Sequence, residues 1–155
     1  MIEEALRALP PGSGFVFRHY HLDPETRQAR FAALADVARS CGHVVILAGS
    51  EPWGADGHYG PPERLGEGLR LATAHDGAEL QAAIAAGADG IFLSPVFPTA
   101  SHPGAASLGV HGFHVLAQQS PIPVIALGGM TADRARALDW PRWGAIDGLA
   151  STKVA

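Results

Sequence analysis

Two adjacent glycines in the C-terminal part of the chain combine features that favour binding of an anion. Gly128 and Gly129 follow an apolar run at residues 124–127 and precede Thr131, a residue type that caps helices. The first N–H groups of a helix have no partner within it, and the helix dipole adds positive charge there. A bare glycine backbone lets an anion approach such donors. The pair therefore predicts a phosphate site, with simple turn glycines as the alternative.

A second candidate is the loop at residues 94–109, which is rich in Pro, Gly, Ser and Ala. Small residues let the backbone approach a ligand closely. Thr99, Ser101 and His102 add polar side chains, and Thr99 and Ser101 are predicted to contact substrate. The loop follows residues 91–93, a short apolar run typical of a parallel strand buried on both faces. We therefore predict a binding loop.

Composition excludes several classes of protein. The chain has 155 residues, 47% of them hydrophobic, which is enough for one core, so we expect one domain over residues 1–155. A net charge of -4 argues against nucleic acid or an anionic membrane as partner. The chain shows neither a membrane-length apolar run nor a signal-peptide pattern. The single Cys41 fits a reducing compartment, so a cytoplasmic protein is expected.

Strand and helix signals alternate along the chain, which is typical of a parallel sheet with crossover helices. Asp23, Asp76 and Thr131 are predicted to cap helices. The other predicted helices cover residues 2–9 and 110–120. The candidate strands lie at residues 14–20, 44–48, 55–59, 69–74, 90–93, 124–127 and 145–149.

These seven strands are one fewer than a closed barrel of alternating strands and helices contains. Such a barrel usually needs about 200 residues or more. The alternation predicts an α/β fold, and the strand count fits a reduced or N-terminally truncated TIM (β/α) barrel with about seven parallel strands, but periodicity alone does not decide between this barrel and other α/β architectures. An open doubly wound sheet is the competing architecture.

Four motifs resemble the thiamine phosphate synthase and thiazole tautomerase (TenI) family. They are Ala-Gly-Ala-Asp-Gly at residues 86–90, Ser-Pro-Val-Phe-Pro-Thr at 94–99, Ser-Leu-Gly at 107–109, and Pro-Ile-Pro-Val-Ile-Ala-Leu-Gly-Gly-Met-Thr at 121–131. They occur in the family's order, and the resemblance implies the family's barrel fold. It also leaves the family's first strand without a counterpart, so the chain is expected to begin in the helix that follows that strand.

The resemblance implies a thiamine-biosynthesis protein that binds a small phosphorylated heterocycle, thiazole phosphate. An active synthase would couple it to a pyrimidine released from its pyrophosphate. The phosphate is expected on the loops after the last two strands, at Gly128 and Gly129 and at Ala150 and Ser151. General barrel physics favours the same place.

The resemblance further implies four catalytic residues, Arg18, Thr73, His75 and His102. Arg18 corresponds to a strand-end arginine of the family, Thr73 to a serine, and His102 to a lysine. Ordinary roles remain open for three of them. Arg18 would also suit a structural ion pair, and the two histidines would also suit polar loop positions.

The family's magnesium site has no counterpart in the sequence. The resemblance aligns the family's Asn-Asp pair with Ala48 and Gly49 and gives no counterpart of the second acidic ligand near Pro61 and Pro62. Magnesium prefers carboxylate oxygens. Although the family uses magnesium, neither a metal site nor a cofactor is expected here.

Two alternatives to a synthase stay open. One is a metal-independent isomerase or hydrolase of a related phosphorylated heterocycle, with His75 or His102 as general base. The other is a catalytically degenerate protein that only binds a phosphorylated ligand.

An unpaired edge at residues 14–20 also predicts a homo-oligomer. Finally, Gly129→Asp is predicted to abolish phosphate binding while the chain still folds.

Overall fold

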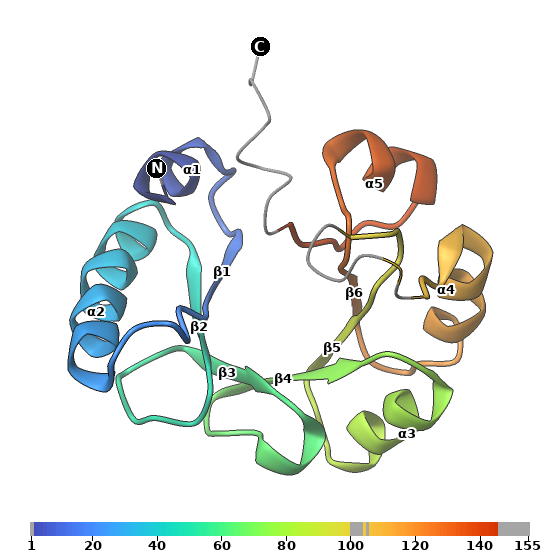
Figure 1. Cartoon of the computed structure of the whole chain (residues 1–155), viewed down its shortest axis with the longest axis horizontal. Helices are drawn as coiled ribbons and strands as arrows, with labels where there is room; N and C mark the ends of the chain where they lie inside the picture. The colour runs from blue at the N-terminus through green and yellow to red at the C-terminus, as the bar shows by residue number, and fades with distance from the viewer. Residues whose placement is uncertain (1, 100–103, 105, 146–155) are drawn as a thin grey trace. The chain divides into compact units, whose positions relative to one another are not determined.

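The computed structural model describes residues 2–99, 104 and 106–145, in which parallel strands alternate with helices (Figure 1). In sheet order, the strands are β1 (Gly14–Phe17), β2 (Val44–Ala48), β3 (Gly57–Gly60), β4 (Leu69–Ala74), β5 (Gly90–Leu93) and β6 (Val124–Ala126). The helices are α1 (Ile2–Ala8), α2 (Pro24–Ser40), α3 (Gly77–Ala85), α4 (Gly109–Ala117) and α5 (Ala132–Leu138), with a 3-10 turn at Pro62–Arg64. This order confirms the predicted α/β fold class. Among the described helices, none combines the length and apolar character needed to cross a bilayer.

Contacts divide the described chain into two compact units, each of which is treated by itself below. Unit 1 holds residues 2–60 and 64–70, and unit 2 holds residues 61–63, 71–99, 104 and 106–145. The expectation of one domain over residues 1–155 stays a prediction.

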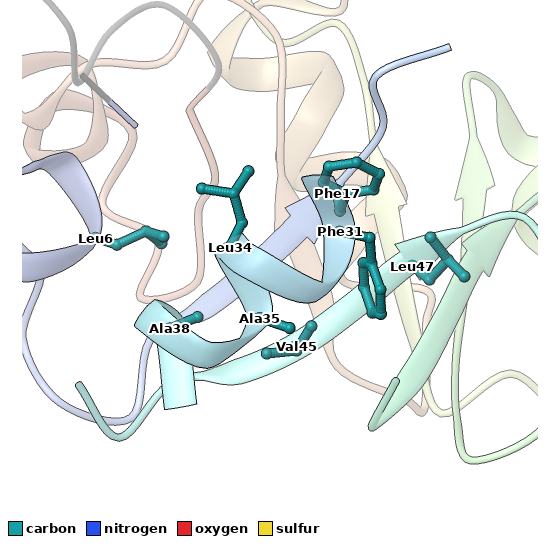
Figure 2. Close-up of a cluster of buried hydrophobic side chains, with 8 residues drawn as sticks. All are labelled: Leu6, Phe17, Phe31, Leu34, Ala35, Ala38, Val45 and Leu47. Carbon is teal, nitrogen blue, oxygen red and sulfur yellow. The ribbon is translucent and has the colours of Figure 1, made fainter. Parts of the chain in front are cut away.

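Unit 1 is built on β1, β2 and β3, which pair in parallel. Asp23 begins α2 as predicted, because its Oδ1 accepts the N–H of Thr26 at 3.0 Å. Apolar side chains from α1, α2, β1 and β2 meet in one core (Figure 2). Its buried members are Leu6, Phe17, Phe31, Leu34, Ala35, Ala38, Val45 and Leu47. The carboxyl ends of β1 and β2 lie at the same edge of the sheet because the strands are parallel.

Unit 2 contains the parallel strands β4, β5 and β6 from Leu71 onward. Asp76 and Thr131 cap α3 and α5 as predicted, accepting backbone N–H groups at 2.8 Å and 3.2 Å. The strands are almost wholly buried, as their apolar sequences predict. The loops after β5 and β6 therefore begin at one edge of unit 2.

The structure shortens the first predicted strand. Residues 14–20 were expected to be extended, but β1 ends at Phe17. His19 has a φ of 44°, and its carbonyl accepts the N–H of Leu22 in a turn. This left-handed conformation is incompatible with a continuing strand.

The last predicted strand, at residues 145–149, lies almost wholly outside the described residues. The chain just before it already pairs with β6, since Trp143 forms an isolated parallel bridge with Ala126. Gly144 donates its N–H to the Ala126 carbonyl at 2.9 Å.

Candidate functional site

In unit 2, the loop between β5 and α4 is hydrogen-bonded to the turn formed by Gly128 and Gly129, here called the diglycine turn. The Val96 N–H donates to the Leu127 carbonyl at 3.0 Å, and the Phe97 N–H donates to the Gly128 carbonyl at 3.1 Å. These bonds extend the parallel pairing of β5 and β6 beyond the strands. The predicted binding loop and the predicted phosphate turn therefore form one structure.

The diglycine turn is tightly packed against this loop. Gly128 and Gly129 have φ values of 99° and 64°, in the left-handed region. A Cβ on Gly128 would lie 2.5 Å from Pro95 Cα, and one on Gly129 would lie 2.8 Å from the Pro98 carbonyl oxygen. Both positions therefore require glycine for packing, whether or not an anion binds.

Because of this packing, a loss of phosphate binding in Gly129→Asp would have two possible causes. An aspartate there would be strained at a φ of 64° and would press against the loop through its Cβ. Loss of binding would then reflect a displaced loop as much as an added negative charge. The substitution consequently does not isolate phosphate binding.

The carbonyls of the diglycine turn accept hydrogen bonds, whereas its N–H groups have no acceptor among the described residues. Arg134 Nη1 donates to the Gly129 carbonyl at 2.6 Å, and its guanidinium lies 5.1 Å from the Phe97 ring centroid. Within residues 2–99, 104 and 106–145, no oxygen accepts the N–H of Gly128 or Gly129. The turn is thus held through its carbonyls, and its donors suit an anion.

His75 follows β4 in unit 2 and is oriented by Glu79. Glu79 Oε2 accepts the backbone N–H of His75 at 2.7 Å and lies 2.8 Å from His75 Nδ1. An ionised carboxylate only accepts hydrogen bonds, so in neutral His75 the proton is assigned to Nδ1 and Nε2 becomes the basic nitrogen. Both side chains are about half exposed. The sequence signal for this pair is a glutamate three residues after the predicted cap Asp76, a spacing typical of a capping box, which indicates a structural role only.

Glu79→Ala is expected to move the proton of neutral His75 from Nδ1 towards Nε2, because the acceptor at Nδ1 is lost. Imidazole ¹⁵N NMR spectra above neutral pH report the tautomer directly. The exposed Asp133→Ala variant is the control and should leave the His75 spectrum unchanged. We expect Glu79→Ala to lower the free energy of unfolding by only about 1 kcal/mol or less, because the pair is exposed. A wild-type His75 already protonated at Nε2 would refute the assignment.

In unit 1, Arg18 directly follows β1 and is exposed. Its guanidinium lies 5.7 Å from the ring centroid of Tyr20, which is 61% exposed. Within the part of the chain that the structure describes, Arg18 forms no ion pair. The structural ion pair that the sequence left open is therefore not formed within the described chain, and the role of Arg18 as a ligand contact stays a prediction.

Arg27 of α2 is buried and joins the carboxyl ends of β1 and β2. Its Nε donates to the Arg18 carbonyl at 3.0 Å, and its Nη2 donates to the Ala48 carbonyl at 2.8 Å. Its Nη1 donates to Glu51 Oε1 at 2.9 Å. The sequence analysis missed Arg27 and Glu51. The available signal was a charged residue four positions before Phe31, on the buried face of α2.

Aromatic rings and charges surround this arginine. The Arg27 guanidinium lies 5.1 Å from the Trp53 ring centroid and 5.4 Å from that of Tyr20, distances typical of cation–π contacts. Burial lowers the pKa of His19, and the positive charges of His21, Arg30 and Arg27 lower it further. Burial raises the pKa of Tyr59, and the positive charge of Arg18 opposes that rise. Arg27 and Arg18 thus act electrostatically on His19 and Tyr59, respectively, in addition to the larger effect of burial.

Comparison with known proteins identifies the family of the chain. The profile of the TMP-TENI family, described as thiamine monophosphate synthase, matches residues 63–142, just over half of the chain. This chain belongs to that family. The sequence-based recognition of the thiamine phosphate synthase and TenI family is thereby confirmed.

Relatives within the family are similar to this chain over only part of their length. A thiamine-phosphate synthase of Geobacillus thermodenitrificans is 40% identical over 78 residues, covering 49% of this chain and 35% of that protein. A thiamine-phosphate synthase of Chloroflexus aurantiacus is 37% identical over 87 residues, covering 56% and 39%. The matched segments thus span little more than a third of these relatives.

A solved structure shows the same fold. Thiamine phosphate pyrophosphorylase from Pyrococcus furiosus superposes with a TM-score of 0.81 at 21% identity, covering 98% of this chain and 80% of that chain. This similarity confirms the predicted TIM-barrel type of α/β fold.

The residues that the resemblance places at the family's magnesium position do not fit a magnesium ion. Ala48 and Gly49 offer no side-chain oxygen, and the nearby Glu51 carboxylate is bound to Arg27 through Oε1. Among the described residues, no group of three or more His, Cys, Asp or Glu is arranged to hold a metal ion. The donor set is thus unlike the oxygen-rich one that magnesium requires.

The structure describes only some of the other predicted site residues. Thr73 lies in β4, partly buried and opposite Phe92 of β5. Thr99 is partly buried in the loop after β5. The remaining four predicted residues fall outside the described part of the chain: Ser101, His102, Ala150 and Ser151. Their assignments stay predictions.

Proposed function

We propose that this family member binds a thiazole phosphate at the carboxyl ends of β5 and β6 and acts as a thiamine-phosphate synthase. The observation that carries the proposal is the hydrogen-bonded junction of the diglycine turn with the loop after β5. That junction lies within the segment matched by the family profile. The names of the relatives, thiamine-phosphate synthases, support the same reaction.

The proposed roles follow from the chemistry of each group. The N–H groups of Gly128 and Gly129 bind the phosphate, and Ala150 and Ser151 complete its site. Thr99 and Ser101 contact the thiazole. Coupling forms a bond from the thiazole to the pyrimidine and breaks the bond to pyrophosphate, so negative charge develops on the leaving group.

Cationic and polar side chains would serve that leaving group. In unit 1, Arg18 is proposed to contact the pyrophosphate. His102 and, in unit 2, Thr73 are proposed to contact substrate, Thr73 as a hydrogen-bond donor. No step is assigned to a metal, because the residues at the family's metal position do not fit one. A degraded magnesium site is therefore part of the proposal.

Binding of thiazole phosphate tests this proposal directly. In ¹H–¹⁵N NMR spectra, thiazole phosphate is expected to shift the amides of Gly128, Gly129 and Ser151 most strongly. The unphosphorylated thiazole alcohol is the control, and it should bind about tenfold more weakly or worse by calorimetry, because it lacks the anion. Equal affinity for both compounds, or unshifted glycine amides, would remove this site from the proposal.

A second candidate function is favoured by the His75–Glu79 pair. An imidazole held with Nε2 as the basic nitrogen suits a metal-independent isomerase or hydrolase of a phosphorylated heterocycle. Formation of thiamine phosphate from the two synthase substrates would support the first function. Exchange of a ring proton without coupling would support the second, and binding without turnover would indicate a phosphate-ligand-binding protein. A cytoplasmic homo-oligomer remains part of either proposal.

A further inference from the structure

The Arg27–Glu51 ion pair of unit 1 lies beside Ala48 and Gly49, the residues that the resemblance aligns with the family's magnesium-binding Asn-Asp pair. We infer that this pair excludes the metal, so that the carboxyl ends of β1 and β2 bind a pyrophosphate-class anion through Arg18 without a divalent cation. The inference deepens the proposed function and rests on it for the identity of the anion. The inference goes beyond the proposed function by naming the residues that exclude the metal.

The position of the pair is the first argument. Ala48 and Gly49 align with the family's Asn-Asp pair, and Arg27 Nη2 binds the Ala48 carbonyl at 2.8 Å. A Cβ on Gly49 would lie only 2.3 Å from Glu51 Oε2. The Glu51 carboxylate therefore occupies the space into which an acidic side chain at position 49 would extend.

The electrostatics of the pair oppose metal binding. Glu51 Oε1 is bound by a guanidinium 2.9 Å away, whose positive charge repels a second cation. Glu51 Oε2 is buried and has no hydrogen-bond partner among the described residues. A magnesium ion needs near-octahedral oxygen coordination and retains several waters, which a single buried oxygen does not provide.

The same pair positions Arg18. Arg27 Nε binds the Arg18 carbonyl at 3.0 Å, and both guanidiniums lie within 6 Å of the Tyr20 ring, at 5.7 Å and 5.4 Å. Arg27 is only 7% exposed, whereas Arg18 is exposed and free of ion pairs within the described chain. Arg18 is consequently the cation that meets an anion, and Arg27 is a positioning residue.

The charge of Glu51 provides a test that distinguishes a metal-free site from a metal-binding one. The two cases predict opposite changes in anion affinity when that charge is removed. If the site works without metal, Glu51 only weakens the positive potential, so Glu51→Gln should strengthen anion binding. If Glu51 instead holds a metal, the same substitution should weaken anion binding. Glutamine keeps the shape and one oxygen for Arg27, so the loop after β2 retains its contact.

The experiment titrates the full chain with inorganic pyrophosphate in EDTA by calorimetry. We expect binding without metal, about threefold tighter binding by Glu51→Gln, and at least about tenfold weaker binding by Arg18→Met. Glu4→Gln, an exposed carboxylate change on α1, is the matched control and should leave the affinity unchanged. Thermal melting of each variant checks that it is folded. If Glu51→Gln unfolds, Arg18→Met still tests the inference, because Arg18 is exposed and its replacement should leave the fold intact.

Manganese binding, followed by electron paramagnetic resonance without any anion, adds a readout for the metal alone. We expect no protein-bound manganese in the wild type. Three results would overturn the inference: no pyrophosphate binding in EDTA, weaker binding by Glu51→Gln, or bound manganese that is lost in Glu51→Gln. Failure of the proposed function would appear separately, in the thiazole phosphate titration at Gly128 and Gly129 of unit 2.

Discussion

Replacing Gly128 with alanine is expected to lower the free energy of unfolding by about 3 kcal/mol or more. The new Cβ would lie 2.5 Å from Pro95 Cα and 2.7 Å from Pro95 Cβ, and backbone atoms cannot yield as a flexible side chain does. A φ of 99° adds strain for any L-residue. Urea denaturation followed by circular dichroism measures the loss.

Gly109→Ala is the matched control for this prediction. Gly109 also has a positive φ, 70°, but a Cβ there would meet nothing within 4 Å. It should therefore cost only the backbone strain, about 1 kcal/mol. If the two variants are equally stable, the loop after β5 is not held against Gly128, and the junction on which the phosphate site depends is lost.

Replacing Arg27 with methionine is expected to cost about 3–5 kcal/mol of unfolding free energy. Methionine keeps much of the side-chain volume but removes three hydrogen bonds, to Arg18, Ala48 and Glu51. Two carbonyls and a partly buried carboxylate would then lose their partner, which is the costly case for buried polar groups. Urea denaturation again gives the magnitude.

Two comparisons make the Arg27 prediction specific. Arg39→Met removes an exposed arginine from the same helix and should cost about 1 kcal/mol or less. Adding Glu51→Gln to Arg27→Met should recover part of the loss, because it removes the carboxylate charge left without a partner. Similar costs for Arg27→Met and Arg39→Met would contradict the structural role of the buried guanidinium.

Local sequence patterns predicted the secondary structure well where short-range contacts decide it. β2 and β4 have the predicted bounds, and Asp23, Asp76 and Thr131 cap their helices as expected. An N-cap binds a backbone N–H three residues ahead, so its signal is contained in a few letters. The first strand was predicted too long because the turn at His19 has no glycine or proline to mark it.

The candidate site was predictable only in part. Gly128 and Gly129 were recognisable because glycines between a strand and a capped helix are a local pattern. The Pro95 backbone that packs against Gly128 lies 33 positions earlier in the chain, and no local pattern reports that contact. Glu79 was visible as a capping residue, but its bond to the His75 ring required the folded turn.

By itself, the sequence determined the α/β alternation, the helix caps and the motifs that mark the family, because each depends on residues close together in the chain. Only the tertiary structure decided the roles of Arg27 and Glu51. The hydrogen bonds of Arg27 join residues 9, 21 and 24 positions apart, and burial makes its charge depend on those partners. Such long-range pairing arises when parallel strands bring their carboxyl ends to one edge of a sheet, so the Arg27–Glu51 pair is visible only in the fold.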